Sequence, residues 1–225
     1  MGYKYEEGLE DAMISSASLT DVDKFKVLGS NTDLPADQVI VGATFRQLFT
    51  DATTSNATNV GTVEATYGTV VEEGDGNFHK TTITLNGAFP AIAGGAALAV
   101  GRKIYTFPLG DIRIISSVMS NMKLQQTEGN VTADTPDLGL GYVIASGANA
   151  LLSANPTFES ILTGQTMADC DGTAKYAGAD AAIAYYINPT PAIAVYLNVA
   201  DTWAASGDVA LGFTGTVVIT WEFLS

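Results

Sequence analysis

Cysteine, histidine and charged side chains are all scarce in this sequence of 225 residues. The single cysteine, Cys170, excludes an intrachain disulfide and is consistent with assembly in a reducing compartment. Charged residues make up only 15%, so the polar surface must come largely from threonine, serine, asparagine and glycine. The single histidine, His79, limits the acid–base and metal chemistry that depends on this residue type. This composition favours a structural or binding role over catalysis.

Basic residues are far fewer than acidic ones. Ten Lys and Arg stand against 24 Asp and Glu, which gives a net charge of −14. From Leu124 onward Lys175 is the only basic residue, against ten acidic ones. Such a chain repels phosphates, so we expect neither a nucleic-acid partner nor a polybasic contact with a membrane. The simplest role of this acidity is solubility.

Long hydrophobic runs are also missing. The longest mildly apolar run, 88–100, is broken by glycines and by Pro90, and it is too short to span a bilayer. The first seven residues lack the apolar core of a signal peptide. We therefore expect a soluble intracellular product.

Residues 1–55 differ from the rest, because they contain clustered charges and little alternation. We interpret this segment as an N-terminal arm or extension, ordered by contact with the body of the protein or with a neighbouring subunit. The alternative, in which it forms the first strand and loops of the domain itself, is equally open.

The sequence is rich in alternation of apolar and polar residues with a period of two, the pattern of a strand with one buried face. The pattern is clearest in 193–199 and 216–223. The core positions expected in these strands are Val195, Leu197, Ile219 and Trp221. Alternation also runs through 112–124, which predicts one long strand with a bend near Ser120. The residues at 73–77 tolerate positive φ and predict a hairpin turn.

These signals predict an all-β fold: an antiparallel β-sandwich of jelly-roll type over 56–225, with a closed barrel as the alternative. The closing strands are expected at 192–199, 208–213 and 215–223. One short helix is expected, because Asn155 is a good N-cap and Pro156 suits the first helical position. It should end near Gly164 after about two turns.

Between the long strand and this helix, 134–141 reads as a loop that contains Gly139 and Gly141. A short strand is expected at 142–145. The other glycine-containing stretches have no strand-to-helix setting with a lysine, so no phosphate-binding loop is indicated.

No catalytic, cofactor-binding or metal-binding residue is predicted. We interpret His79 as a strand-surface histidine, because no Gly-x-Ser-x-Gly elbow exists and nothing places Cys170 near it. Cys170 itself is expected to be buried. The sequence Asn-x-Thr at Asn56 and Asn130 matches the glycosylation pattern, which carries no weight without a secretory signal.

Acidic residues offer two further candidates. Asp169 and Asp171 resemble the start of a calcium loop, but the glycine falls at position 4 and the twelfth position lacks Glu. We interpret them as an acidic turn and leave a weak Ca²⁺ site open. The carboxylate pairs of a glycosidase are defined by their separation in space. The pairs that the sequence offers are Glu72 with Glu73 and Asp134 with Asp137.

The two tryptophans lead to different expectations. Trp203 lies in a loop, where it could stack on a sugar, plug the end of the sandwich or contact another subunit. Trp221 lies on the apolar side of the last strand and is expected in the core.

Five segments carry a resemblance to a known family. They are Tyr105–Ile114, Asp137–Gly141, Ile161–Gly164, Ala194–Val199 and Gly215–Trp221. In this order they resemble the body of a family of virion proteins of tailed bacteriophages that decorate or cement the capsid. The resemblance spans about 60–225, and the first 55 residues match nothing in it.

The resemblance implies a non-enzymatic capsid stabiliser that needs no cofactor. It would bind the major capsid protein from outside as a homo-oligomer, a dimer or a trimer. It would be assembled in the host cytoplasm and end on the virion exterior. The arm would reach a neighbour's sheet edge or an inter-capsomer groove. The alternatives are a carbohydrate- or host-surface-binding β-sandwich that uses Trp203 as a platform, and a jelly-roll hydrolase.

Overall fold

The computed structural model describes residues 60–74, 77–180, 184–187 and 190–224. The predicted arm at 1–55 and the Asn56 motif lie outside the described residues. No helix in the described ranges is long and apolar enough to cross a membrane.

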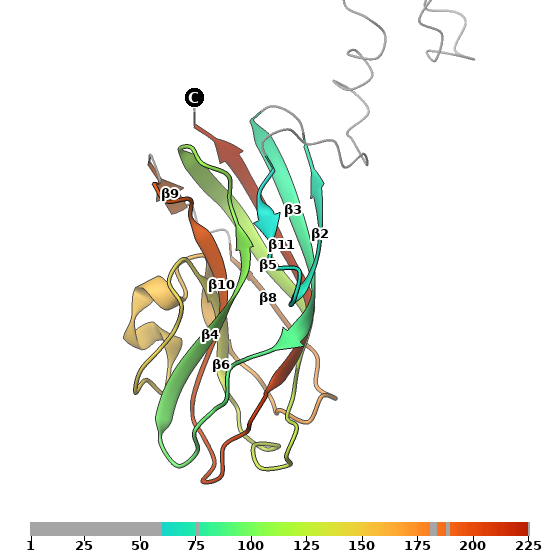
Figure 1. Ribbon diagram of the computed structural model, residues 1–225, viewed down its shortest axis with the longest axis vertical. Helices are drawn as coiled ribbons and strands as arrows, with labels where there is room; N and C mark the ends of the chain where they lie inside the picture. The colour runs from blue at the N-terminus through green and yellow to red at the C-terminus, as the bar shows by residue number, and fades with distance from the viewer. Residues whose placement is uncertain (1–59, 75–76, 181–183, 188–189, 225) are drawn as a thin grey trace, which may run out of the picture. The chain divides into compact units, whose positions relative to one another are not determined.

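The described chain is mostly β and forms two antiparallel sheets (Figure 1). Sheet A has the order β1 (Thr62–Val63), β4 (Ala97–Thr106), β10 (Ala194–Thr202), β6 (Asp137–Gly141) and β7 (Leu162–Thr166). Sheet B has the order β2 (Gly68–Glu73), β3 (Phe78–Ala88), β11 (Gly212–Phe223), β5 (Ile112–Gln125) and β8 (Tyr176–Asp180), and β9 (Ala184–Tyr186) also pairs with β5. The prediction of an all-β, antiparallel fold is confirmed.

One hydrophobic core lies between the sheets, which gives a sandwich-like arrangement. The four positions predicted to point inward, Val195 and Leu197 on β10 and Ile219 and Trp221 on β11, are all fully buried. Alternation selects these residues because successive side chains of a strand point to opposite faces. Each large aliphatic side chain removed from water contributes about 1.5–3 kcal/mol, so the core is the main stabilising element.

Two local predictions are also confirmed. β5 is a single strand of 14 residues, and its pairing shifts between Met119 and Met122, where Asn121 has a φ of 52°. This irregularity is the bend expected near Ser120. β2 and β3 form the expected hairpin, and Gly74 begins its turn with a φ of 117°.

The predicted two-turn helix is wrong in length. Asn155 does cap a helical turn by accepting a hydrogen bond from the Thr157 amide at 3.2 Å, but the turn is a 3-10 helix of three residues, η3 (Pro156–Phe158). A second such turn, η2 (Leu152–Ala154), precedes it. Gly164, the expected stop, lies inside β7. Pairing of β7 with β6 takes the chain back into sheet A before a second helical turn forms.

Two strand boundaries are also corrected. The segment Asp137–Gly141, expected to be part of a loop, is strand β6, and the strand expected at 142–145 is absent from the described structure there. Of the closing strands expected at 208–213 and 215–223, residues 212–223 form one strand, β11, whose pairing with β5 shifts around Gly215, whereas 208–211 lie outside it, with an isolated bridge at Asp208. Gly215 has a φ of 146°. What looks in the sequence like a break between two strands is therefore a bulge within one strand.

The segment 142–158, which includes η2 and η3, packs on part of the outer face of sheet A and forms a small second core there with Ala99 and Ala200 (Figure 1). The close approach of this segment to sheet A explains why glycine occurs within strands β4 and β6. Asn198 of β10 is paired with Gly101 on one side and with Gly139 on the other. A Cβ atom at Gly141 would lie 2.4 Å from the Thr157 carbonyl oxygen. Glycine in a strand often marks such an approach of another backbone.

Candidate functional site

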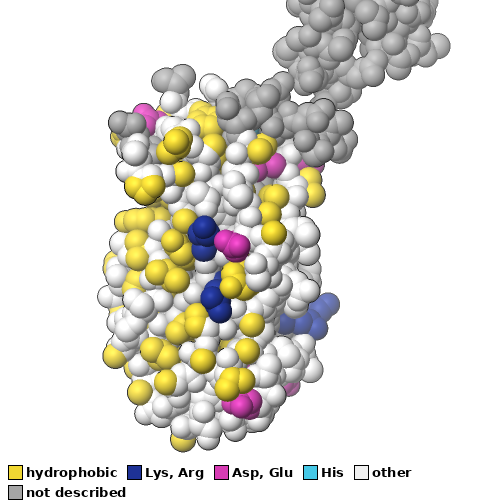
Figure 2. All heavy atoms as spheres, in the orientation of Figure 1, with side chains coloured by type: hydrophobic (Ala, Val, Ile, Leu, Met, Phe, Trp, Pro, Cys, Tyr) yellow, Lys and Arg dark blue, Asp and Glu magenta, His cyan; other side chains and the backbone are white. Residues whose placement is uncertain are grey.

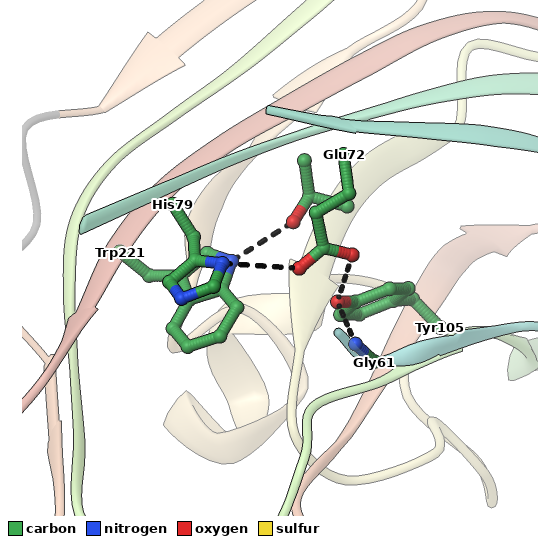
Figure 3. Close-up of polar contacts among 6 residues, drawn as sticks. Gly61, Glu72, His79, Tyr105 and Trp221 are labelled. Atoms are coloured by element: carbon green, nitrogen blue, oxygen red, sulfur yellow. Dashed lines mark hydrogen bonds and ion pairs between the residues drawn. The ribbon is translucent and has the colours of Figure 1, made fainter. Parts of the chain in front are cut away.

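A group of polar side chains lies inside the sandwich (Figure 3). Glu72 on β2 and His79 on β3 point into the core from sheet B, and Tyr105 on β4 points in from sheet A. Trp221 on β11, Thr81 on β3 and Gly61, just before β1, complete the group shown. These residues converge because the inward positions of four neighbouring strands meet at one end of the core.

Hydrogen bonds connect this cluster across the two sheets. The Tyr105 hydroxyl donates to Glu72 Oε2 at 2.8 Å and accepts from the Gly61 amide at 3.0 Å. His79 Nδ1 lies 3.6 Å from Glu72 Oε1 (Figure 3). Trp221 donates its indole N–H to Thr81 at 2.8 Å. The carboxylate of a β2 residue is thereby joined to a phenol of the opposite sheet.

The prediction that His79 lies on the strand surface is wrong. Its side chain is only 2% exposed, and its ring stacks on Trp221 with centroids 4.1 Å apart and an interplanar angle of 11°. The neighbouring Phe78 is instead 59% exposed. His79 is paired with the buried Trp221 in the sheet, so it shares the inward face with that residue, and Phe78 points outward.

Tyr105 acts in this cluster as a neutral hydrogen-bond donor. Burial raises the pKa of the Tyr105 phenol well above its usual range, and the nearby Glu72 carboxylate raises it further. The hydroxyl therefore keeps its proton at neutral pH. A phenol that cannot ionise is suited to holding a carboxylate and an amide in place, and not to general-base chemistry.

Replacing Tyr105 with phenylalanine tests this interpretation. We expect Tyr105→Phe to lower the free energy of unfolding by about 1.5–3 kcal/mol, because a buried carboxylate oxygen loses its donor. The measurement is urea denaturation, together with hydrogen exchange at the Gly61 amide, which should become faster. Tyr196→Phe, at a partly exposed tyrosine of β10, is the matched control. Equal stabilities of the two variants would refute a stabilising role for the Tyr105 hydroxyl.

Cys170 does not join this cluster. As predicted it is buried, and its thiol approaches the Asp134 carbonyl oxygen at 3.7 Å. Burial, reinforced by the charge of Asp134, raises the pKa of the Cys170 thiol to about 12. The thiol is therefore protonated at neutral pH and unsuited to act as a nucleophile.

The calcium-loop candidates form a self-contained turn. Asp171 Oδ1 accepts hydrogen bonds from the amide and hydroxyl of Thr173 at 2.7 and 2.6 Å, and Asp169 accepts from the Asp171 amide at 3.3 Å. The bonds from Thr173 hold the pKa of Asp171 below its usual range. Within the described ranges, no three His, Cys, Asp or Glu residues are grouped to hold a metal ion.

The carboxylate pairs are engaged separately. Glu73 forms an ion pair with Lys80 at 2.8 Å, whereas its neighbour Glu72 is buried. Asp134 accepts a hydrogen bond from the Ala204 amide, and Asp137 accepts one from the Leu152 amide, both at 2.9 Å. Each of these aspartates anchors a loop.

Of the three roles left open for Trp203, the structure favours packing inside the sandwich over stacking on a sugar. The side chain is buried, and its indole N–H donates to the Leu98 carbonyl at 2.9 Å. Trp203 thus belongs to the core that both sheets share. Trp221 is a core residue, as predicted.

Two buried polar anchors were missed by the sequence analysis. Asn198 connects the segment 142–158 to β10 through hydrogen bonds with the backbone of Val143, Ala145 and Phe158. Asp208 accepts hydrogen bonds from Thr127, Glu128 and Ala210 at 2.6–3.2 Å. Burial acts to raise the pKa of Asp208, but these hydrogen bonds outweigh it and hold the pKa below its usual range. The signal available for Asn198 was the occurrence of Gly101 and Gly139, which face it on the two neighbouring strands. Nothing in the sequence around Asp208 marks it as a buried residue.

Comparisons with known proteins do not add to this picture. A scan against protein-family models gave no match, and searches of curated proteins and of solved structures gave none either.

Proposed function

We propose that the protein is a structural component of a bacteriophage particle, a decoration or cement protein that binds the major capsid shell from outside and has no enzymatic activity. The observation that carries the proposal is the position of the five segments that resemble this family. They coincide with β6, β10, β11, the start of β7 and the junction of β4 and β5. The resemblance therefore lies in the sandwich framework and not in a catalytic site.

We further propose that the sandwich is of jelly-roll type. In a jelly roll of eight strands, the first pairs with the eighth, the second with the seventh, and so on inward, as in one long hairpin rolled up. The antiparallel pairs β3 with β11, β4 with β10, β5 with β8, and β6 with β7 follow this order. This order supports the proposal, and capsid proteins commonly use this architecture.

The buried polar cluster fits the same function. Its hydrogen bonds tie sheet A to sheet B and leave the Tyr105 phenol unsuited to proton transfer. A cement protein needs a body that resists deformation while many weak contacts act together. On this proposal the polar core of the sandwich stiffens the body, and binding lies on the outer surface.

The test is to add the purified protein to shells of the parent phage that lack it and to image them by electron microscopy. We expect saturable density at capsomer junctions and shells that withstand heating better than bare ones. A protein that ignores the shells and binds glycans on an array would overturn the proposal and favour the host-surface-binding alternative.

A further inference from the structure

Strand β1 is held to the sandwich by few contacts. It has two residues, and within the described chain they pair with the last two residues of β4, Tyr105 and Thr106. The Glu64 amide extends this pairing by donating a hydrogen bond to the Ile104 carbonyl at 3.0 Å. None of the side chains in 60–64 is buried, so the strand covers little apolar surface.

A polar contact joins this strand to the interior. The Gly61 amide donates to the Tyr105 hydroxyl at 3.0 Å, and the same hydroxyl donates to Glu72 Oε2 at 2.8 Å (Figure 3). The Glu72 side chain is only 6% exposed. Charged side chains are few even on the surface drawn in Figure 2, so a carboxylate inside the sandwich is an exception. Removing a carboxylate from water costs free energy that its hydrogen bonds only partly return.

We propose that β1 is a detachable strand, which leaves the edge of β4 while both sheets stay folded. When Gly61 moves away, water reaches the Tyr105 hydroxyl and, next to it, the Glu72 carboxylate. The hydration that the carboxylate regains offsets part of the hydrogen bonding lost with β4. Segments with few buried apolar contacts are the ones that open locally while the rest of a protein remains folded.

The sandwich keeps its core when β1 is away. Ile104 and Tyr105 are fully buried, and β4 remains paired with β10 along its whole length. The chain then enters the sandwich at the turn 65–67, before β2, and no longer at Gly61. Because residues 1–59 precede β1 in the sequence, its release changes where this part of the chain is attached.

Hydrogen exchange of the full-length protein, followed by NMR at one pH, tests the proposal. In the wild type, the amides of Gly61 and Glu64 should exchange at least about 100-fold faster than those of β10, after correction for intrinsic rates. This difference is expected because opening of β1 exposes the first two amides and leaves β10 in place.

Two substitutions by glutamine test the role of the buried charge. Glu72→Gln keeps the shape of the side chain and an oxygen that accepts from Tyr105, but it has no charge to hydrate. Exchange at Gly61 and Glu64 should therefore become at least about 10-fold slower. Glu73→Gln is the matched control, because Glu73 forms an ion pair with Lys80 near the surface, and it should leave both rates unchanged.

Gly61→Ala should have the opposite effect. Its added Cβ atom would overlap the Tyr105 hydroxyl and the Thr106 carbonyl oxygen, so β1 should stay detached. The Glu64 amide should then lose most of its protection, while the amides of β10 keep theirs. Gly212→Ala, where the nearest atom lies 3.2 Å from the added Cβ, should leave the Glu64 amide as in the wild type.

Three outcomes would overturn the inference. The first is equal protection of the Gly61 and β10 amides in the wild type. The second is exchange that Glu72→Gln leaves unchanged or makes faster. The third is a loss of β10 protection in Gly61→Ala, which would mean that β1 and the sandwich unfold together. None of these measurements involves a capsid shell, so their outcome and that of the proposed function are independent.

Discussion

Asn198→Asp is expected to lower the free energy of unfolding by at least about 4 kcal/mol at pH 7. Asn198 is fully buried, and its amide group donates to the Val143 and Phe158 carbonyls at 2.9 and 2.7 Å. Its Oδ1 accepts from the Ala145 amide at 2.9 Å. An aspartate of the same shape removes both donors and turns a negative charge toward two carbonyl oxygens. For a domain of this size the melting temperature should fall by about 10 °C.

The dependence on pH makes this prediction specific. Burial raises the pKa of the introduced carboxyl above its unfolded value of about 3.9. The destabilisation is therefore complete above the folded pKa and shrinks as the pH falls toward 4, where the protonated acid regains one donor. Urea denaturation at pH 7 and pH 4.5 should show the gap to wild type narrowing. Asn86→Asp, at an exposed asparagine of β3, should show a small gap at both values. A gap for Asn198→Asp that does not change with pH would contradict the proposed cause.

Gly141→Ala should be the second large effect, a loss of about 3 kcal/mol. A Cβ atom at this position would meet the Thr157 oxygen at 2.4 Å and two backbone atoms of Phe158 at 2.5 Å. Because these are backbone atoms, η3 has to move away from β6. The melting temperature reports the loss, and faster hydrogen exchange in η3 reports where it arises.

Gly212→Ala is the matched control in another strand. The nearest atom to its added Cβ, the Gln125 carbonyl oxygen, lies at 3.2 Å, so a much smaller loss is expected. Similar losses for the two variants would mean that alanine acts through the strand itself and not through the contact with η3.

The sequence predicted those parts of the fold that depend on local alternation. Val195, Leu197, Ile219 and Trp221 were placed correctly because the apolar side of a strand is buried whatever lies elsewhere in the chain. Elements that depend on a distant contact were missed. Gly139 and Gly141 look like loop residues until η2 and η3 are seen to pack on them. His79 was misplaced because its burial depends on Trp221, which lies far along the sequence.

The buried cluster could not be foreseen for the same reason. Glu72 next to Glu73 looks like an exposed acidic pair, and only strand register separates them, one inward and one outward. Its partner Tyr105 comes from the other sheet, so no spacing in the sequence joins the two. At Asp169 and Asp171, by contrast, the side-chain hydrogen bonds join residues only two positions apart, so this local turn is of a kind that sequence can indicate.

The packing of the segment 142–158 on sheet A has a consequence for how this part of the sheet meets other molecules. The segment buries Ala99 and Ala200 of the two central strands, and it is held there by the hydrogen bonds of Asn198. Another β-sheet therefore cannot stack on this part of sheet A unless the segment is first displaced. The chain thus protects a stretch of its own sheet from face-to-face association by covering it with its own residues.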